Sequence, residues 1–384
     1  MSNDVKRCDY KRFILSCEGE PGQFRLCPNS EFSHYSVCFA IFGMQLLNCN
    51  SWLESNKGVL LSSLLGHLNY INNQLLGDIS EKLNKGTLQY VCFAFSCLAI
   101  LGEEKQSVAY EISRKVVEST QVKDYLMRCG ALKGVPGSGN AAMFYAIFLA
   151  YLQKHFDYNA ASKIDEWFDL HKKHMNIHGF WGNPDKSHYL QFQNGYHQYE
   201  IFEYFGEQVP RLAEAKELIL TLMDSDYHFA PYPGGGGCYD YDAVFILTMN
   251  GAETDPAILR KIIDSISGEQ KENGGFAENC FIDPFSTSFL FNSVLNIIRS
   301  QKEFRHEKMR RTISCLRPKN YRVHTHWTKY SRKWGEANLW DSWFRTLLVA
   351  RASVSLEPHS ARNWGFIDCP GIGFNRQALK SKNQ

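Results

Sequence analysis

The chain of 384 residues carries almost no excess of charge of either sign, since 42 Lys and Arg face 40 Asp and Glu. Binding to nucleic acid, or to a membrane through a polybasic segment, needs a clear positive balance, so the composition indicates neither partner. The sequence also lacks a run of about 18 uncharged apolar residues, which excludes a membrane-spanning helix. No signal-type apolar segment follows the polar opening, and we therefore expect a cytoplasmic location.

Paired cysteine motifs are missing as well. The twelve cysteines are scattered without a Cys-x-x-Cys pair, and Cys38, Cys92 and Cys97 lie within apolar stretches. Thiols in such surroundings behave as small buried hydrophobic groups, so we predict reduced cysteines rather than a disulfide framework. Aromatic residues are abundant, with 26 Phe, 19 Tyr and 8 Trp, and we expect some of them to line a pocket.

A short repeated unit organises the sequence. Each copy is an anchor of Gly, one further residue and a large apolar residue, and a loop and an apolar helix follow it. The copies are Gly22-Gln-Phe24, Gly130-Ala-Leu132, Gly179-Phe-Trp181 and Gly274-Gly-Phe276, with His228-Phe229 as a variant that lacks the Gly. From Leu132 to Phe276 the large apolar residues of successive anchors lie 47 to 49 residues apart. A constant period of this length is typical of helical repeat proteins.

Two kinds of helix are predicted to alternate along the chain. The first kind is apolar on all sides and is expected to be buried, in residues 33–47, 88–101, 140–152, 194–205, 240–249, 286–298 and 338–350. The second kind is amphipathic, with apolar residues at three- and four-residue spacing, in residues 160–173, 211–223 and 256–267. We interpret the apolar helices as inner elements and the amphipathic helices as outer elements.

Such units must share a core, because one apolar and one amphipathic helix cannot bury each other completely. Helices that are apolar on all sides need cover on both faces, and an open solenoid would leave one face in water. We therefore predict an all-α protein folded as a closed α/α toroid of about six to seven helical hairpin repeats. No linker divides the sequence, so residues 1–384 are expected to form a single domain.

The best copy of the anchor carries a family resemblance. Gln270-Lys-Glu-Asn-Gly274-Gly-Phe276 resembles the Gln-x-x-x-Gly-x-Trp/Phe repeat of the terpenoid cyclase and protein prenyltransferase superfamily. The resemblance implies an α/α toroid over roughly residues 22–366. It also implies a small-molecule substrate, which we expect to bind near the starts of the inner helices.

The resemblance includes one ligand position of a zinc site. Gly237-Cys238-Tyr239 resembles the position at which a protein prenyltransferase β subunit places its zinc-bound thiolate. However, the other two ligand positions of that family fall on Gly236 and Ser286. A catalytic zinc ion needs about three protein ligands, so we expect no metal and no other cofactor.

The next residues resemble a different motif of the superfamily. Asp240-Tyr-Asp242 is similar to the Asp-x-Asp-Asp segment of class II terpene cyclases, whose middle Asp protonates an alkene or an epoxide. By this resemblance Asp242 is the proton donor and Asp240 supports it, while Ala243 replaces the third Asp. A protonated carboxylic acid in a dry pocket is the chemical requirement. A helix N-cap followed by a first-turn carboxylate remains an open alternative for the same two residues.

Other polar residues within the apolar helices are further candidates. His197 and Glu200 lie on one helical face, where they would form either an acid–base pair or a buried structural pair. Trp340 and Asp341 place an aromatic ring beside a carboxylate, which suits a cation-stabilising pocket or a sugar platform. The predicted substrate contacts are Cys238, Tyr239, Asn140, Ser286, Trp340 and Asp341.

Three functions fit these residues. The first is an enzyme that acts on an isoprenoid-like substrate, with Asp242 as the acid. The second is a carbohydrate-active toroid, and the third is a toroid that binds a ligand or partner without catalysis. All three share one structural prediction: inner helices begin near His34, Asn140, Asn194, Asp240 and Ser286, and their starts face one mouth.

Overall fold

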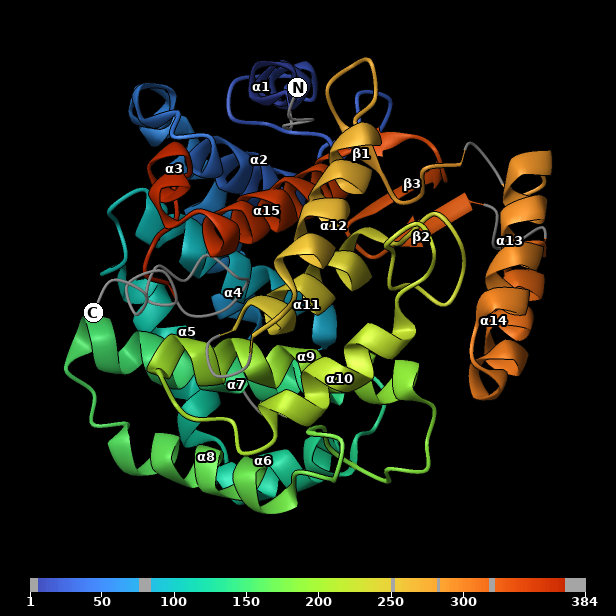
Figure 1. The fold of residues 1–384 in the computed structure, drawn as a ribbon. Coiled ribbons are helices and arrows are strands. Elements are labelled where there is room, and N and C mark those ends of the chain that lie inside the picture. The colour runs from blue at the N-terminus through green and yellow to red at the C-terminus, as the bar shows by residue number, and fades with distance from the viewer. Residues whose placement is uncertain (1–5, 76–83, 250–252, 282–283, 318–321, 370–384) are drawn as a thin grey trace.

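Six helices form a closed ring in the computed structural model, which describes residues 6–75, 84–249, 253–281, 284–317 and 322–369. In chain order the ring helices are α2 (His34–Leu46), α4 (Lys85–Ile100), α7 (Ser138–Phe156), α9 (His188–Phe205), α11 (Gly237–Thr248) and α15 (Leu339–Leu356). Each packs against the next, and α15 packs against α2 to close the ring (Figure 1). The predicted all-α toroid is therefore confirmed.

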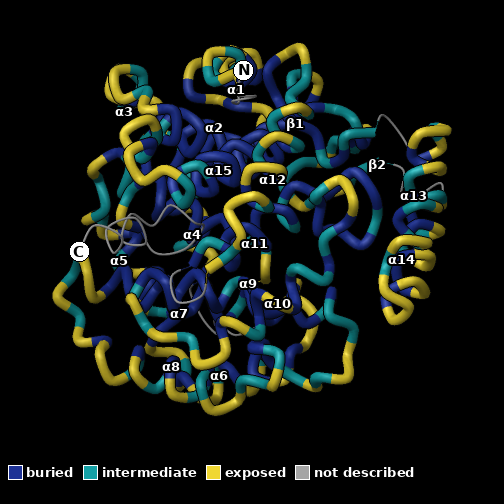
Figure 2. The backbone as a smooth tube through the Cα atoms, viewed as in Figure 1, coloured by how far each residue is buried: buried dark blue, intermediate teal, exposed yellow. Residues whose placement is uncertain are grey.

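A second layer of helices covers the ring. Its members are α1 (Arg7–Ser16), α3 (Asn50–Gln74), α5 (Ser107–Glu118), α8 (Ala161–His174), α10 (Leu212–Leu222) and α12 (Pro256–Gly268), with the short α6 (Val122–Cys129) beside α8. These helices expose one face to water, whereas the ring helices are buried along most of their length (Figure 2). The two kinds of helix read from the sequence thus correspond to the two layers, and the expectation of one domain over residues 1–384 stays a prediction.

The described strands are short and lie at the end of the ring where α15 begins. β1 (Phe276–Ala277) pairs with β4 (Ala337–Asn338), and β2 (Arg322–Thr325) forms a hairpin with β3 (Thr328–Lys333). Two short 3-10 helices, η1 (Ala131–Lys133) and η2 (Pro358–Asn363), follow α6 and α15. None of the helices in the described residues combines the length and the apolarity that crossing a bilayer requires.

The anchors of the repeat are tight turns into the ring. Their glycines adopt left-handed backbone angles, with φ of 75° to 89°, at Gly22, Gly130, Gly179 and Gly274. Glycine adopts this conformation without steric cost because it has no Cβ. In the His228-Phe229 variant, Tyr227 occupies the equivalent position and also has a positive φ, of 67°. The turn is therefore kept even where its usual residue is replaced, and the large apolar residue that follows is buried in every copy.

One predicted inner helix lies outside the ring. Ser286 caps α13 (Thr287–Arg299) as its Oγ accepts a hydrogen bond from the Phe289 amide at 3.2 Å. This helix packs against α14 (Lys302–Cys315) as a hairpin at the edge of the molecule, drawn in orange in Figure 1. The prediction was wrong because α13 buries only one narrow face, which includes Ser293 and Asn296. α15 fills the sixth position of the ring instead.

The starts of the ring helices meet at one end of the toroid, which we call the mouth. The Asn194 carboxamide of α9 accepts a hydrogen bond from the Gly137 amide at the start of α7. The turn between β2 and β3 lies over α2 and α4, since Ser33 donates to the Trp327 carbonyl and His326 Nε2 lies 2.9 Å from Gln89 Oε1. The predicted starts at His34, Asn140 and Asp240 are correct within a few residues, while α9 begins earlier than predicted, at His188.

Candidate active site

The two aspartates of α11 point in different directions. Gly236 is the N-cap of this helix, so Asp240 and Asp242 both lie within regular helix and the N-cap interpretation is wrong. Residues two apart on an α-helix leave it about 200° from each other. Asp240 is completely buried, whereas 7% of the Asp242 surface remains accessible. The fold therefore gives the two carboxyl groups separate environments.

Asp240 belongs to a buried network of ion pairs. Its Oδ2 lies 2.9 Å from His228 Nδ1 and 3.3 Å from Arg345 Nη1, while its Oδ1 accepts a hydrogen bond from the Phe229 amide. Glu269 completes the network, with its carboxylate 2.7 Å from His228 Nε2 and 2.9 Å from Arg345 Nη1. Two carboxylates thus face an imidazolium and a guanidinium at the wall of the ring.

In this network the neighbouring charges shift the pKa values of Asp240 and His228 more than burial does. Burial by itself would raise the pKa of Asp240, but the nearby His228 and Arg345 hold it below its ordinary value. Burial would lower the pKa of His228, but Glu269 and Asp240 raise it well above its ordinary value. Both groups are therefore charged near neutral pH, and Asp240 ties the helix α11 to the anchor loop and to α15.

The same network contains the described residues that come closest to a metal site. Ligand atoms of His228, Glu269 and Cys280 lie within 4.8 Å of one another. Arg345 already supplies a cation to the carboxylates, and both ring nitrogens of His228 are paired. We therefore interpret the cluster as a salt-bridge network. The expectation of no metal and no cofactor stays a prediction.

Asp242 lies on the inner side of α11 and faces α9. Burial raises its pKa well above the ordinary value, and the neighbouring carboxylates of Glu200 and Asp240 raise it further. In the described part of the chain, no side chain forms a hydrogen bond or an ion pair with its carboxyl group. Without a compensating cation, the protonated form of Asp242 is favoured.

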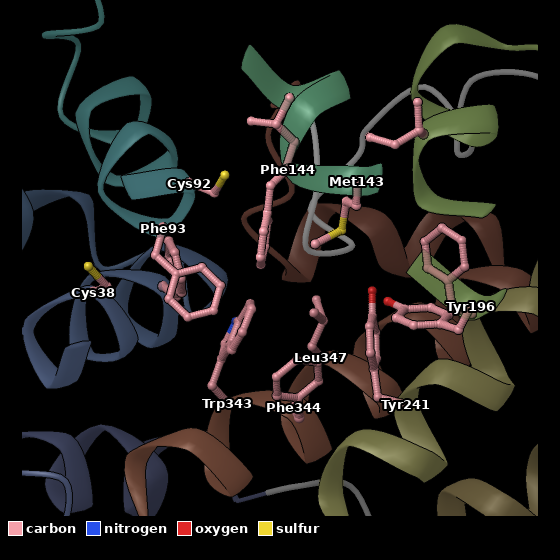
Figure 3. Packing of buried hydrophobic residues seen from close by; sticks show 14 of the residues in the cluster. Cys38, Cys92, Phe93, Met143, Phe144, Tyr196, Tyr241, Trp343, Phe344 and Leu347 are labelled. Carbon is pink, nitrogen blue, oxygen red and sulfur yellow. The ribbon is translucent and has the colours of Figure 1, made fainter. Parts of the chain in front are cut away.

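Two tyrosines lie beside this acid and belong to a larger group of aromatic rings. Tyr196 of α9 donates a hydrogen bond to Glu200, and the Tyr196 and Tyr241 rings lie 6.2 Å apart. Tyr241 also contacts Phe344 of α15, with 5.0 Å between ring centroids. Figure 3 shows Phe344 and Tyr241 directed into the same interior region, with Met143 of α7 on the opposite side. The interior beside Asp242 is therefore rich in aromatic faces, with Glu200 as a charged neighbour.

A second ion pair lies deeper in the ring and spans two helices. Arg351 of α15 binds the Glu203 carboxylate of α9 through both terminal nitrogens, and its Nε donates to Thr248 at 2.7 Å. The guanidinium also lies 3.9 Å from the centroid of the Phe245 ring. These contacts hold α9, α11 and α15 together below the acid.

His197 and Glu200 do not form the predicted acid–base pair. Glu200 accepts the hydroxyl of Tyr196, and in the described residues His197 Nδ1 has no hydrogen-bond partner. Burial lowers the pKa of His197 to about 3, and the charge of Lys85 acts in the same direction. His197 is therefore a neutral imidazole near neutral pH.

The mouth contains an acid that sequence reasoning missed. Burial raises the pKa of Glu278 to about 7, and the nearby Asp341 contributes, although Arg332 opposes the shift. Glu278 follows the anchor residue Phe276 by two positions, which is the signal in the sequence that could have found it. Its carboxylate is 3.3 Å from Arg332 and remains partly accessible.

The predicted substrate contacts are divided between the mouth and the wall of the ring. Cys238 and Tyr239 are half-buried at the start of α11, and Asn140 is buried near the start of α7. Burial raises the pKa of the Cys238 thiol well above its ordinary value, and the carboxylates of Asp242 and Glu278 add to the effect. Ser286 caps a helix outside the ring, so it does not belong to this site.

Trp340 and Asp341 lie at the start of α15 and have structural partners. Asp341 is completely buried, 3.2 Å from Arg332 Nη2, and its backbone amide donates to the Asn338 side chain. The Trp340 ring lies 4.2 Å from the rings of both Trp327 and Phe344. These two residues hold the rim of the mouth together.

A cavity of about 710 Å³ opens beside the mouth, between the start of α2 and the β2–β3 turn. Its lining includes His34, His67, His326 and Trp327. The rings of His34 and His67 are stacked 3.9 Å apart, and burial lowers the pKa of His34 to about 4. Burial also lowers the pKa of His67, so the stacked rings are neutral near neutral pH.

The fold and site together define an α/α toroid with a buried carboxylic acid of raised pKa beside aromatic rings. No family model and no curated protein matches the sequence. Among solved structures, the chain is similar to the type II terpene cyclase MstE from Scytonema. A variant of that protein in complex with geranylgeranyl dihydroxybenzoate gives 11% identity, a TM-score of 0.47, and coverage of 93% of this chain and 96% of that chain. The apo form of MstE gives 12% identity, a TM-score of 0.45, and coverage of 92% and 97%.

Proposed function

We propose that the protein is an enzyme of the terpenoid-cyclase type that transfers a proton from Asp242 to an isoprenoid-like substrate inside the toroid. The observation that supports this most directly is the environment of Asp242. Its carboxyl group is buried, has carboxylates rather than cations as neighbours, and keeps a small accessible surface. Its raised pKa favours the protonated form, which is what a general acid requires.

The chemistry follows from the groups beside the acid. The π electrons of a terminal alkene, or the oxygen of an epoxide, take the proton from Asp242, and positive charge develops on carbon. The electron-rich faces of Tyr196, Tyr241 and Phe344 attract this charge. A neighbouring alkene closes the ring, the final cation loses a proton, and the Asp242 carboxylate regains one before the next cycle.

The other acids add to the effect of burial on the pKa of Asp242. Glu200 is held by the Tyr196 hydroxyl and adds negative potential close to Asp242. Asp240 faces the opposite way and gives its oxygens to His228, Phe229 and Arg345. Two carboxylates thus favour the protonated state of the third without occupying the same space.

The alternatives receive less support from the same residues. A glycoside hydrolase needs two carboxyl groups that face each other across the substrate, but Asp240 and Asp341 are bound in ion pairs. Thiol chemistry at Cys238 needs a thiolate, and the raised pKa of this thiol favours the protonated form. A toroid that only binds a ligand is the outcome to expect if no variant of Asp242 affects turnover.

The test compares two isosteric variants on linear isoprenoids that end in an alkene or an epoxide. Asp242→Asn keeps the shape and removes the proton, so we expect product formation, measured by mass spectrometry, to fall by about 10² to 10⁴-fold. Glu278→Gln at the mouth is the matched control and is expected to change the rate far less. Equal losses in both variants, or cyclisation by Asp242→Asn at the wild-type rate, would contradict the proposal.

A further inference from the structure

The outer face of the α13–α14 hairpin is unusually apolar for a surface. Six large apolar side chains are 39% to 65% exposed there, and together they define the hairpin face: Leu290, Phe291, Val294, Ile298, Met309 and Ile313. On α13 they recur at three- and four-residue spacing, so they form one continuous stripe. Contiguous exposed apolar surface on a protein marks an interaction site.

The opposite sides of both helices attach the hairpin to the toroid. Phe289 of α13 is buried against Trp334, with 5.8 Å between ring centroids. Phe304 of α14 packs on His188 at the start of α9, and Glu307 accepts a hydrogen bond from Ser187. Because both helices bury these sides, the hairpin face is directed away from the ring (Figure 2).

Basic side chains accompany the hairpin face. The exposed charged residues on and beside the two helices are Arg299, Lys302, Arg305, Arg310 and Arg317, against one exposed acid, Glu303. Glu307 and Lys308 are buried and do not contribute to the surface. On α14, Lys302, Arg310, Met309 and Ile313 lie on the same exposed side, since helical residues three, four, seven or eight apart are neighbours.

We propose that the α13–α14 hairpin binds the protein to the surface of an anionic lipid bilayer. A helix with exposed Phe, Leu, Ile and Val beside basic residues inserts its apolar side chains at the boundary between headgroups and acyl chains. The basic residues are attracted by the negative surface potential of anionic lipids. This charge distribution favours a lipid surface over a second copy of the chain, whose own hairpin would repel it.

The location of the hairpin agrees with this role and does not depend on the proposed enzymatic function. α14 packs on the loop and the first turn of α9, which is at the mouth end of the ring. Binding through the hairpin face would therefore bring the mouth close to the lipid. Turnover and membrane binding can fail separately, because Asp242 and the hairpin face share no residue.

The test is co-sedimentation of the full chain with vesicles of phosphatidylcholine alone or mixed with phosphatidylglycerol. We expect binding to the anionic vesicles that weakens in high salt, and little binding to the neutral ones. The double variant Phe291→Ser/Ile298→Ser should bind at least about tenfold more weakly, since each loses a large apolar group from the interface. Arg305→Glu/Arg310→Glu should bind the anionic vesicles more weakly, and the remaining binding should no longer depend on salt.

Matched controls separate the hairpin face from general effects. Ile177→Ser removes a side chain that is 59% exposed elsewhere on the surface, and its binding should equal that of the wild type. Thermal melts establish that each variant is folded. Binding that is equal for all variants, or absent from anionic vesicles, would overturn the proposal. So would a dimer in sedimentation that is lost in Phe291→Ser/Ile298→Ser, because the face would then belong to a second copy.

Discussion

Helices α11 and α13 follow the same kind of anchor, yet α11 lies in the ring and α13 lies outside it. α11 buries most of its residues, including Asp240 and Asp242, within the ring. α13 buries Phe289, Ser293 and Asn296 and leaves its apolar stripe exposed. The anchor therefore determines where a helix begins, and its side chains decide whether the ring or the surface receives it. α11 has ion-pair partners on the anchor loop and on α15, and the apolar stripe of α13 has no partner among the described residues.

The largest effect expected from this comparison is the loss of the ion-pair network that holds α11. Asp240→Asn leaves His228 and Arg345 buried without their carboxylate, and removing one partner of a buried ion pair costs about 3–5 kcal/mol. The free energy of unfolding in urea measures this. Asp242→Asn removes no ion pair and is the control. A loss in Asp240→Asn that is no larger than in the control would show that the network contributes little to stability.

The next largest effect concerns the stability of the α13–α14 hairpin, which we expect to differ from that of the ring. Phe289→Ala removes the main buried contact of α13, and loss of a buried Phe costs about 3–5 kcal/mol in a well-packed core. We expect the loss to appear as local opening, because Phe289 belongs to a small cluster with Trp334 and Cys315. Hydrogen exchange should then increase in α13 and α14 and remain slow in α11. Faster exchange throughout the ring would show that the hairpin folds as part of it.

The pH dependence of stability should also distinguish the two aspartates. The folded-state pKa of Asp242 is raised above its ordinary value of 3.8, so the folded state binds the proton more tightly than the unfolded state does. Its contribution to stability is therefore present at low pH and is lost as the pH rises through the folded-state pKa. Asp242→Asn should remove this loss and be more stable than the wild type at neutral pH.

The contribution of Asp240 to stability depends on pH in the opposite direction. Its folded-state pKa is lowered, so its contribution is present above the ordinary value of 3.8 and is lost as the pH falls through the folded-state pKa. Urea unfolding between pH 3 and pH 7 should show a steeper acid loss in the wild type than in Asp240→Asn. Identical profiles for the two aspartate variants would contradict the separate environments of the two carboxyl groups.

The smallest effect is expected on the hairpin face. Phe291→Ser and Ile298→Ser replace exposed side chains, and surface substitutions usually change stability by less than about 0.5 kcal/mol. Phe245→Ser in α11, which is buried beside Arg351, should lower the melting temperature clearly. If the two hairpin variants destabilise the protein as much as Phe245→Ser does, their side chains are packed in solution and the face is not free.

The period of the anchors and the alternation of apolar and amphipathic helices were sufficient to predict the toroid. Both patterns express burial, and burial is recorded locally in the spacing of apolar residues. The same reasoning predicted that the starts of the inner helices meet at one mouth, whereas Asp242 came from the family resemblance and its role stays a prediction. The apolar pattern also placed residues 286–298 in the ring, because the apolar composition of a helix does not show whether its apolar residues face a core or the surface.

The roles of the charged residues were decided only by the tertiary structure. Asp240 and Asp242 are equivalent in the sequence, and they differ because His228, Arg345 and Glu269 arrive from distant segments on one side of α11 while Glu200 and Tyr196 lie on the other. Glu278 has a pKa near 7 because folding buries it beside Asp341. The near-zero net charge of the sequence likewise gives no sign that basic and apolar side chains gather on the hairpin face. A pKa and a surface patch depend on which groups the fold brings within a few ångströms of each other, and the order of residues along the chain does not contain that distance.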